Sequence, residues 1–136
     1  MSDIHEQFPI GKVFEHQFKV TPGIVESFKS LSGDINPVHV DSHYAKSKGF
    51  NDVIVYGNVL GLGISHLIGM ALPRKEVIIL KQAVDFHSPM YLDDTILIAA
   101  TVKAIFESVN AVELTLVAIN QGQKKVAKGT LLFKCI

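Results

Sequence analysis

The segment from residue 32 to residue 43 concentrates polar side chains that could do chemistry. It reads Ser-Gly-Asp-Ile-Asn-Pro-Val-His-Val-Asp-Ser-His, so Asp34 stands five residues before His39 across a turn built around Asn36-Pro37. A carboxylate and an imidazole on one rigid turn can share a water molecule, one as general base and the other as general acid. The purely structural interpretation is that the Asp and Asn side chains form hydrogen bonds with the backbone of a turn. The segment therefore predicts either an acid–base pair or a well-capped turn.

Metal binding is a third interpretation of the same segment. His39 and His43 are four residues apart, and Asp34 and Asp41 are close in sequence. Two such histidines could chelate a metal ion if they lay on one helix. Pro37 and a helix start expected after residue 41 place His39 outside such a helix. We therefore expect no metal ion here.

A second candidate site lies where an uncharged segment begins. Gly57 opens a helix expected over residues 57–72, and the N–H groups at a helix start are unpaired and can stabilise a developing oxyanion. The simpler role of Gly57 is close packing of the backbone. Ser65 and His66, two turns further on, are polar residues on an apolar helix. Their default interpretation is a hydrogen bond made within the core.

Composition excludes several classes of function. The 136 residues carry 13 basic and 13 acidic side chains, so the net charge is zero and a basic footprint for nucleic acid is absent. The single cysteine, Cys135, cannot form an internal disulfide, which fits a reducing compartment and predicts a cytoplasmic protein. Residues 53–73 are uncharged and long enough to span a membrane, but they contain Asn58, Ser65, His66 and four glycines. We expect a buried helix there instead.

Hydrophobic periodicity predicts the elements that must position these residues. Residues 13–20 alternate as a half-buried strand, with Phe14, His16, Phe18 and Val20 on one side. Helices are expected over 22–31, with Ile24, Phe28 and Leu31 on one stripe, and over 42–47 and 57–72. Four strands are then expected over 77–91, 95–105, 111–120 and 126–136.

This order predicts an α+β fold in a single domain, residues 1–136. Consecutive strands with short turns indicate an antiparallel meander, and the apolar helix 57–72 is long enough to fill its curved face. The predicted architecture is a curved antiparallel sheet wrapped around one buried helix. Such a sheet has open edges, and the charged content is only 19%, so we expect a homodimer.

The sequence also resembles a known family. Residues 28–41 read F-K-S-L-S-G-D-I-N-P-V-H-V-D, which is similar to the hydratase-2 signature of the MaoC-like dehydratases, a family that includes the (R)-specific enoyl-CoA hydratases. The family pattern is roughly aromatic-x-x-L-S-G-D-x-N-P-hydrophobic-H-x-D, and every specified position matches. Residues 86–95 are similar to the family's F-x-x-P-V-x-x-G-D stretch. With the glycine-rich helix, the resemblance covers nearly the whole chain.

The resemblance implies a hot-dog fold and a hydro-lyase without a cofactor. The implied substrate is a trans-2-enoyl thioester of coenzyme A or acyl carrier protein, hydrated to the (R)-3-hydroxyacyl thioester, or the reverse. Asp34 and His39 would be the catalytic pair, with Asn36 between them in the motif. The Gly57 N–H would bind the thioester oxygen, and Ser65 would support the site through a hydrogen bond.

Two departures from the family pattern flank the glycine. Tyr56 and Asn58 stand where the family commonly has His and Met, and they are expected to shorten or polarise the acyl pocket. We therefore predict a preference for short or polar-substituted enoyl thioesters. The alternatives are a hot-dog thioesterase, by analogy of fold alone, and a non-catalytic thioester-binding module, against which the intact Asp34/His39 pair argues.

Overall fold

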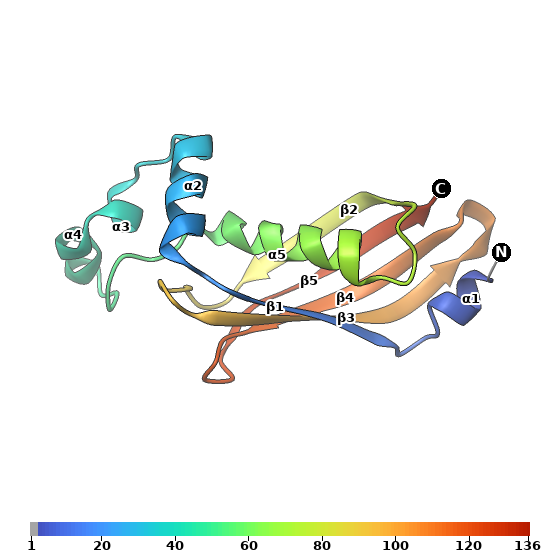
Figure 1. The fold of residues 1–136 in the computed structure, drawn as a ribbon. Helices are drawn as coiled ribbons and strands as arrows, with labels where there is room; N and C mark the ends of the chain where they lie inside the picture. Colours follow the sequence, from blue (N-terminus) through green and yellow to red (C-terminus); the bar gives the residue numbers. More distant parts are fainter. Residues whose placement is uncertain (1–2) are drawn as a thin grey trace.

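The computed structural model describes residues 3–136, which build one curved antiparallel sheet with a long helix lying along it (Figure 1). The strands stand in the order β1-β3-β4-β5-β2, so β1 and β2 are the edges. Their bounds are β1 (Val13–Lys19), β2 (Val77–Phe86), β3 (Thr95–Phe106), β4 (Ala111–Ile119) and β5 (Lys125–Cys135).

Within residues 3–136, four α-helices occur besides the helix that lies on the sheet. They are α1 (Ile4–Gln7), α2 (Pro22–Ser32), α3 (Pro37–Val40) and α4 (Ser42–Ser47), and η3 (Glu107–Val109) is a single 3₁₀ turn. The long helix starts as a 3₁₀ turn, continues as α-helix and ends in a π-helical turn: η1 (Gly57–Val59), α5 (Leu60–His66) and η2 (Leu67–Ala71). It covers the predicted range 57–72 to within one residue.

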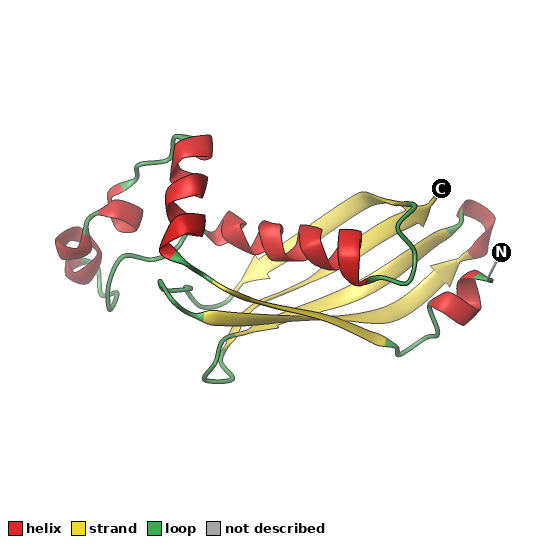
Figure 2. Ribbon diagram, viewed as in Figure 1, coloured by secondary structure: helices red, strands yellow, loops and turns green. Residues whose placement is uncertain are grey.

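The core lies between this helix and the concave face of the sheet (Figure 2). β3 and β4 alternate buried and half-buried side chains, as the period of two predicts. The helix approaches β1 and β3 closely at Gly63, where an added Cβ would lie 2.5 Å from the Phe18 ring and 2.7 Å from the Ile98 side chain. A helix held this closely along a curved antiparallel sheet is the hot-dog arrangement, so the predicted fold is confirmed.

The predicted meander of four consecutive strands is wrong for its first strand. β3, β4 and β5 pair in sequence order, but β2 pairs with β5 and not with β3. The strand expected over 77–91 ends at Phe86, ahead of Pro89, and residues 87–94 connect it to β3 across the end of the sheet. In this connection Met90 accepts from the Val55 N–H at 2.8 Å, and Asp93 donates to the Val20 carbonyl at 2.8 Å. A tight turn between β2 and β3 is therefore replaced by a crossing that anchors the start of the long helix.

The long helix is not buried all round. Its inner face carries Leu60, Ile64 and Leu67 in the core, but its outer face is exposed in the single chain. The exposed residues are Asn58, Leu62, Ser65, His66, Gly69 and Met70. The expected core hydrogen bonds of Ser65 and His66 are therefore wrong, because the sheet covers only one side of the helix. Within residues 3–136, no helix is long and apolar enough to cross a membrane.

The helices α2, α3 and α4 extend beyond one end of the sheet (Figure 1). Thr21 caps α2 by accepting from the Ile24 N–H, and Gly33 ends it in the left-handed conformation, as predicted. The expected stripe is wrong at Leu31, which is 89% exposed, because α2 has no sheet beneath its last turn. The helix α3 was not predicted, because Asn36-Pro37 is equally good turn chemistry and helix-start chemistry.

Candidate active site

His39 is held from both sides by its own short helix and by residues before the long helix. The Asn36 side chain accepts from the Val38 N–H at 3.1 Å and so caps α3, on which His39 lies. The His39 Nδ1 lies 2.7 Å from the Ile54 carbonyl oxygen, and its ring packs against the Tyr56 ring with centroids 4.2 Å apart. Because a carbonyl only accepts, Nδ1 carries a proton, and in the neutral imidazole Nε2 is left as an acceptor.

Asp34 uses its two carboxylate oxygens differently. Oδ1 accepts from the Asn36 N–H at 3.0 Å, which closes the turn, and the Asp34 N–H donates to the Ser32 Oγ at 3.2 Å. Oδ2 lies 4.0 Å from the His39 Nε2. The capped turn is therefore formed, and it leaves the carboxylate facing the imidazole, so the two interpretations of the segment are compatible. One oxygen fixes the loop and the other faces the imidazole.

The gap between the two groups suits a bridging molecule. A separation of 4.0 Å is too long for a direct hydrogen bond, but a water or a substrate hydroxyl can bond both groups at once. The Asp34 side chain is 45% exposed and that of His39 is 15% exposed, so the carboxylate stays hydrated while the imidazole is mostly enclosed. The arrangement can orient one water molecule and accept a proton from it.

The imidazole and Gly57 face one largely apolar cavity of about 300 Å³. Gly57 is the first residue of the long helix, and none of the hydrogen bonds within residues 3–136 uses its N–H. Asp34 does not line this cavity and reaches it only through His39. The lining residues are His39, Phe50, Ile54, Val55, Gly57, Leu60, Phe86, His87, Ser88, Pro89, Met90, Val126 and Ala127.

Comparison with known proteins agrees with this geometry. The family model described as MaoC like domain matches residues 6–122. The chain is 33% identical to an (R)-specific enoyl-CoA hydratase of Aeromonas caviae over 110 residues, which is 81% of this chain and 82% of that protein. This protein belongs to the MaoC-like family.

Solved structures place the MaoC-like chain beside two R-hydratases. The (R)-hydratase of A. caviae superposes with a TM-score of 0.88 at 28% identity, covering 96% of this chain and 99% of that one. The unliganded R-hydratase of Pseudomonas aeruginosa gives 0.87 at 28% identity, covering 96% and 84%. The family resemblance and the hot-dog fold are both confirmed by these matches.

The two departures from the family pattern lie outside the cavity at Gly57. Tyr56 is buried, at 3% exposed, and lines a neighbouring cavity of about 220 Å³ together with His39 and Lys29. Asn58 is exposed and lines a groove of about 240 Å³ between the long helix and β2. Neither side chain therefore touches the space that His39 and Gly57 share, and any effect on the acyl chain reaches it through neighbours.

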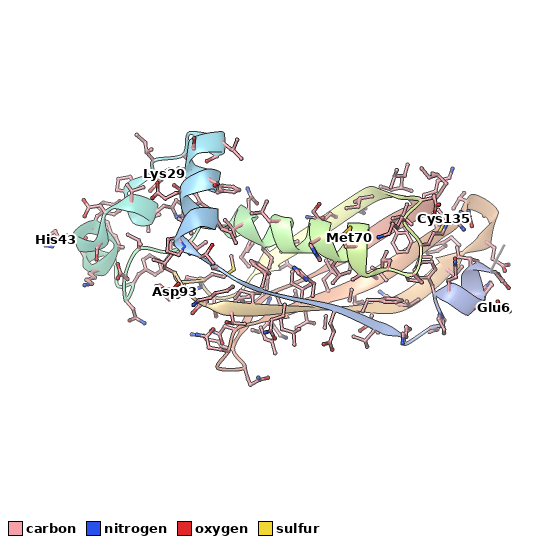
Figure 3. All side chains as sticks on the ribbon, in the orientation of Figure 1. Glu6, Lys29, His43, Met70, Asp93 and Cys135 are labelled. Carbon is pink, nitrogen blue, oxygen red and sulfur yellow. The ribbon has the colours of Figure 1, made fainter. Side chains whose placement is uncertain are left out.

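Ser65 and His43 are not brought to the pair within one chain. Ser65 lies eight residues beyond Gly57, roughly 12 Å along the helix at 1.5 Å per residue, and its exposed side chain makes none of the hydrogen bonds within residues 3–136. His43 projects from α4, at the end of the molecule farthest from the C-terminus (Figure 3). Among residues 3–136, no three His, Cys, Asp or Glu side chains cluster in a way that could hold a metal ion.

Sequence reasoning missed two parts of the MaoC-like site. The Ile54 carbonyl fixes the His39 tautomer, and a backbone acceptor leaves no signal in a sequence. Phe86 lies against Gly57, with its Cε1 3.2 Å from where a Cβ would be, and it separates the cavity at Gly57 from the groove along β2. Phe86 begins the F-x-x-P stretch, and this was the sequence signal that could have identified it as a residue of the site.

Proposed function

We propose that this protein catalyses the (R)-specific hydration of trans-2-enoyl thioesters, or the reverse dehydration of (R)-3-hydroxyacyl thioesters. The observation that carries the proposal is the Asp34 carboxylate set 4.0 Å from the His39 Nε2, with His39 and Gly57 on one apolar cavity. The names of its relatives, an (R)-specific enoyl-CoA hydratase and R-hydratases, support the same reaction.

The geometry suggests the order of steps. A water held between Asp34 and His39 attacks C3 of the enoyl group and gives one proton to the pair as its oxygen bonds to carbon. Negative charge moves to the thioester oxygen, where the Gly57 N–H at the start of the long helix donates a hydrogen bond. A proton from the pair then adds to C2. Every atom of the product comes from the substrate and one water.

Each group has an expected size of effect. A positioned acid–base group contributes roughly 10²–10⁴ in rate, and one oxyanion donor roughly 10²–10³. The apolar walls of the cavity strengthen the hydrogen bond to the developing oxyanion, because electrostatic interactions are screened less there than in water. These contributions need no group from outside the chain.

The cavity at Gly57 is the space that would hold the acyl chain. Its volume is about 300 Å³, and Phe86 closes the side that faces the groove along β2. We propose that thioesters with four to six acyl carbons are turned over faster than those with ten or more. We expect the same order of chain lengths with coenzyme A and with acyl carrier protein as the carrier.

The test is an assay that separates addition of water from cleavage of the thioester. Purified protein is mixed with crotonyl-CoA, loss of the enoyl absorbance is followed, free thiol is measured with a disulfide reagent, and the product is resolved on a chiral column. We expect absorbance loss without thiol release, and (R)-3-hydroxybutyryl-CoA as product. Thiol release would indicate a thioesterase. Binding without turnover would indicate a thioester-binding module, and either result would overturn the proposal.

We propose further that the working form is a cytoplasmic homodimer. The unpaired, buried Cys135 fits a reducing compartment. The edge strand β2 exposes Ile78, Ile79 and Leu80, and the outer face of the long helix exposes Leu62 and Met70. Exposed apolar side chains at a sheet edge favour pairing with a second copy. Light scattering should give twice the mass of one chain, and a mass near one chain at micromolar concentration would refute this.

A further inference from the structure

Tyr56 touches both members of the Asp34/His39 pair. Its hydroxyl donates to the Asp34 carbonyl oxygen at 2.5 Å, and its ring packs against the His39 ring with centroids 4.2 Å apart. The Tyr56 ring also packs against Phe28 of α2, at 4.9 Å between centroids. The side chain is almost completely buried. One residue therefore connects the loop that carries the carboxylate to the ring that carries the base.

The Asp34 loop has few other anchors. Residues 33–36 have no regular secondary structure and connect α2 to α3. The other hydrogen bonds of Asp34 within residues 3–136 are local, from its own N–H to Ser32 and from the Asn36 N–H to its Oδ1. These bonds join Asp34 to Asn36, the residue that caps α3, so they hold the carboxylate to the helix of His39 only through neighbours along the chain. The Tyr56 hydroxyl adds a hydrogen bond to this loop from 22 residues away.

The tyrosine is suited to act as a fixed donor. Burial raises the pKa of the Tyr56 hydroxyl above its ordinary value of 10.0, and the neighbouring Asp34 charge raises this pKa further. The hydroxyl therefore remains protonated and donates through the neutral range.

We propose that Tyr56 is a positioning residue that sets the separation between the Asp34 carboxylate and the His39 imidazole through its hydrogen bond to the Asp34 carbonyl. The inference rests on the hydration proposed above and assigns Tyr56 a role in that reaction, in place of shaping the acyl pocket. Tyr56 touches the pair and not the cavity at Gly57, so its loss changes turnover more than substrate binding. Misplacing a reacting group by about 1 Å can cost about 100-fold in rate.

The first test is Tyr56→Phe, which keeps the ring contacts and removes only the hydroxyl. We expect kcat for crotonyl-CoA to fall about 10- to 100-fold while KM stays within about twofold. The matched control is Tyr44→Phe on α4, whose hydroxyl makes none of the hydrogen bonds within residues 3–136; it should keep the wild-type kcat. A Tyr56→Phe kcat within about twofold of wild type overturns the proposal.

A double-mutant cycle separates positioning from general structural damage. If Tyr56 acts through Asp34, the Tyr56→Phe change should lower kcat no further in an Asp34→Asn background. If the two losses multiply, Tyr56 acts independently of the carboxylate and the proposal is wrong. The measurement uses the full chain and the same hydration assay for all four proteins.

A third readout does not depend on turnover. In the NMR spectrum we expect the His39 ring signals to shift or broaden in Tyr56→Phe and to remain unchanged in Tyr44→Phe. Unchanged His39 signals in Tyr56→Phe would overturn the positioning role even if the wild-type protein hydrates no enoyl thioester. Absent hydration in the wild type, with shifted His39 signals in the variant, would instead refute only the proposed reaction.

Discussion

Replacing Asp34 by Asn tests the acid–base pair with little other change. The new side chain has the same shape, and its amide oxygen can still accept from the Asn36 N–H, now at 3.0 Å from Oδ1. Its NH₂ group takes the place of Oδ2, 4.0 Å from the His39 Nε2. An amide nitrogen donates and cannot accept a proton from water. The turn therefore survives while the proton acceptor is lost.

The structure predicts different magnitudes for activity and stability. Removing one acid–base group lowers kcat by about 10²–10⁴, which is about 2.7–5.4 kcal/mol of barrier at 1.36 kcal/mol for each factor of ten. The stability cost is smaller, because the carboxylate is 45% exposed and 4.0 Å from His39. An interaction of this kind contributes about 0–1 kcal/mol. A fall in kcat without a matching loss of stability is the expected signature.

The assay measures the initial rate of enoyl-CoA hydration and urea unfolding on the same preparations. The control is Asp41→Asn, because Asp41 is also an exposed carboxylate that caps a helix, accepting from the Tyr44 N–H at 3.1 Å, and it is not paired with His39. The reasoning is refuted if Asp34→Asn keeps its kcat within tenfold of wild type, or if Asp41→Asn loses as much.

Three further changes probe the fold and the cavity. Gly63→Ala should lower the free energy of unfolding by about 1–3 kcal/mol, because the new methyl group overpacks the core. Gly69→Ala is the control and should not lower it, because nothing lies within 4 Å of its new Cβ; urea unfolding of both variants measures the difference. Phe86→Ala should shift the kcat/KM optimum across C4 to C12 enoyl-CoAs to longer chains, since it joins the cavity to the groove along β2; an unchanged profile contradicts this. Burial and the neighbouring His66 lower the pKa of His16 below 6.5, so the unfolded chain binds this proton more readily than the folded chain. The Tm should therefore fall as the pH drops below 6.5, and it should fall less in His16→Gln.

The local parts of the fold follow directly from the sequence. Thr21-Pro22 and Gly33 set the ends of α2, and both caps are formed as expected, with Gly33 at φ 70°. Asn120 at the expected hairpin turn accepts from the Gly122 and Lys124 N–H groups. Each of these features depends on neighbours within a few residues, so periodicity and turn chemistry are enough to place it.

The non-local parts could not be predicted in this way. β2 pairs with β5 and not with β3, because the chain crosses the end of the sheet after Phe86, and periodicity within a strand does not identify its partner. The same limit applies to His39, which was expected on a loop and lies on α3 between the Ile54 carbonyl and the Tyr56 ring. Because of these contacts, His39→Ala should cost stability as well as activity, which makes Asp34→Asn the cleaner test.

The exposed face of the long helix lacks charged residues. Only 19% of the residues are charged, and none of residues 53–73 is, although much of one helix face in that range is exposed in the single chain. A helix that met water permanently on this face would be expected to carry charges there. Leu62 and Met70 on the helix and Ile79 on the free edge of β2 lie on surfaces left open by the sheet. A second copy covering the helix face and the β2 edge would account for both the missing charges and the exposed apolar side chains.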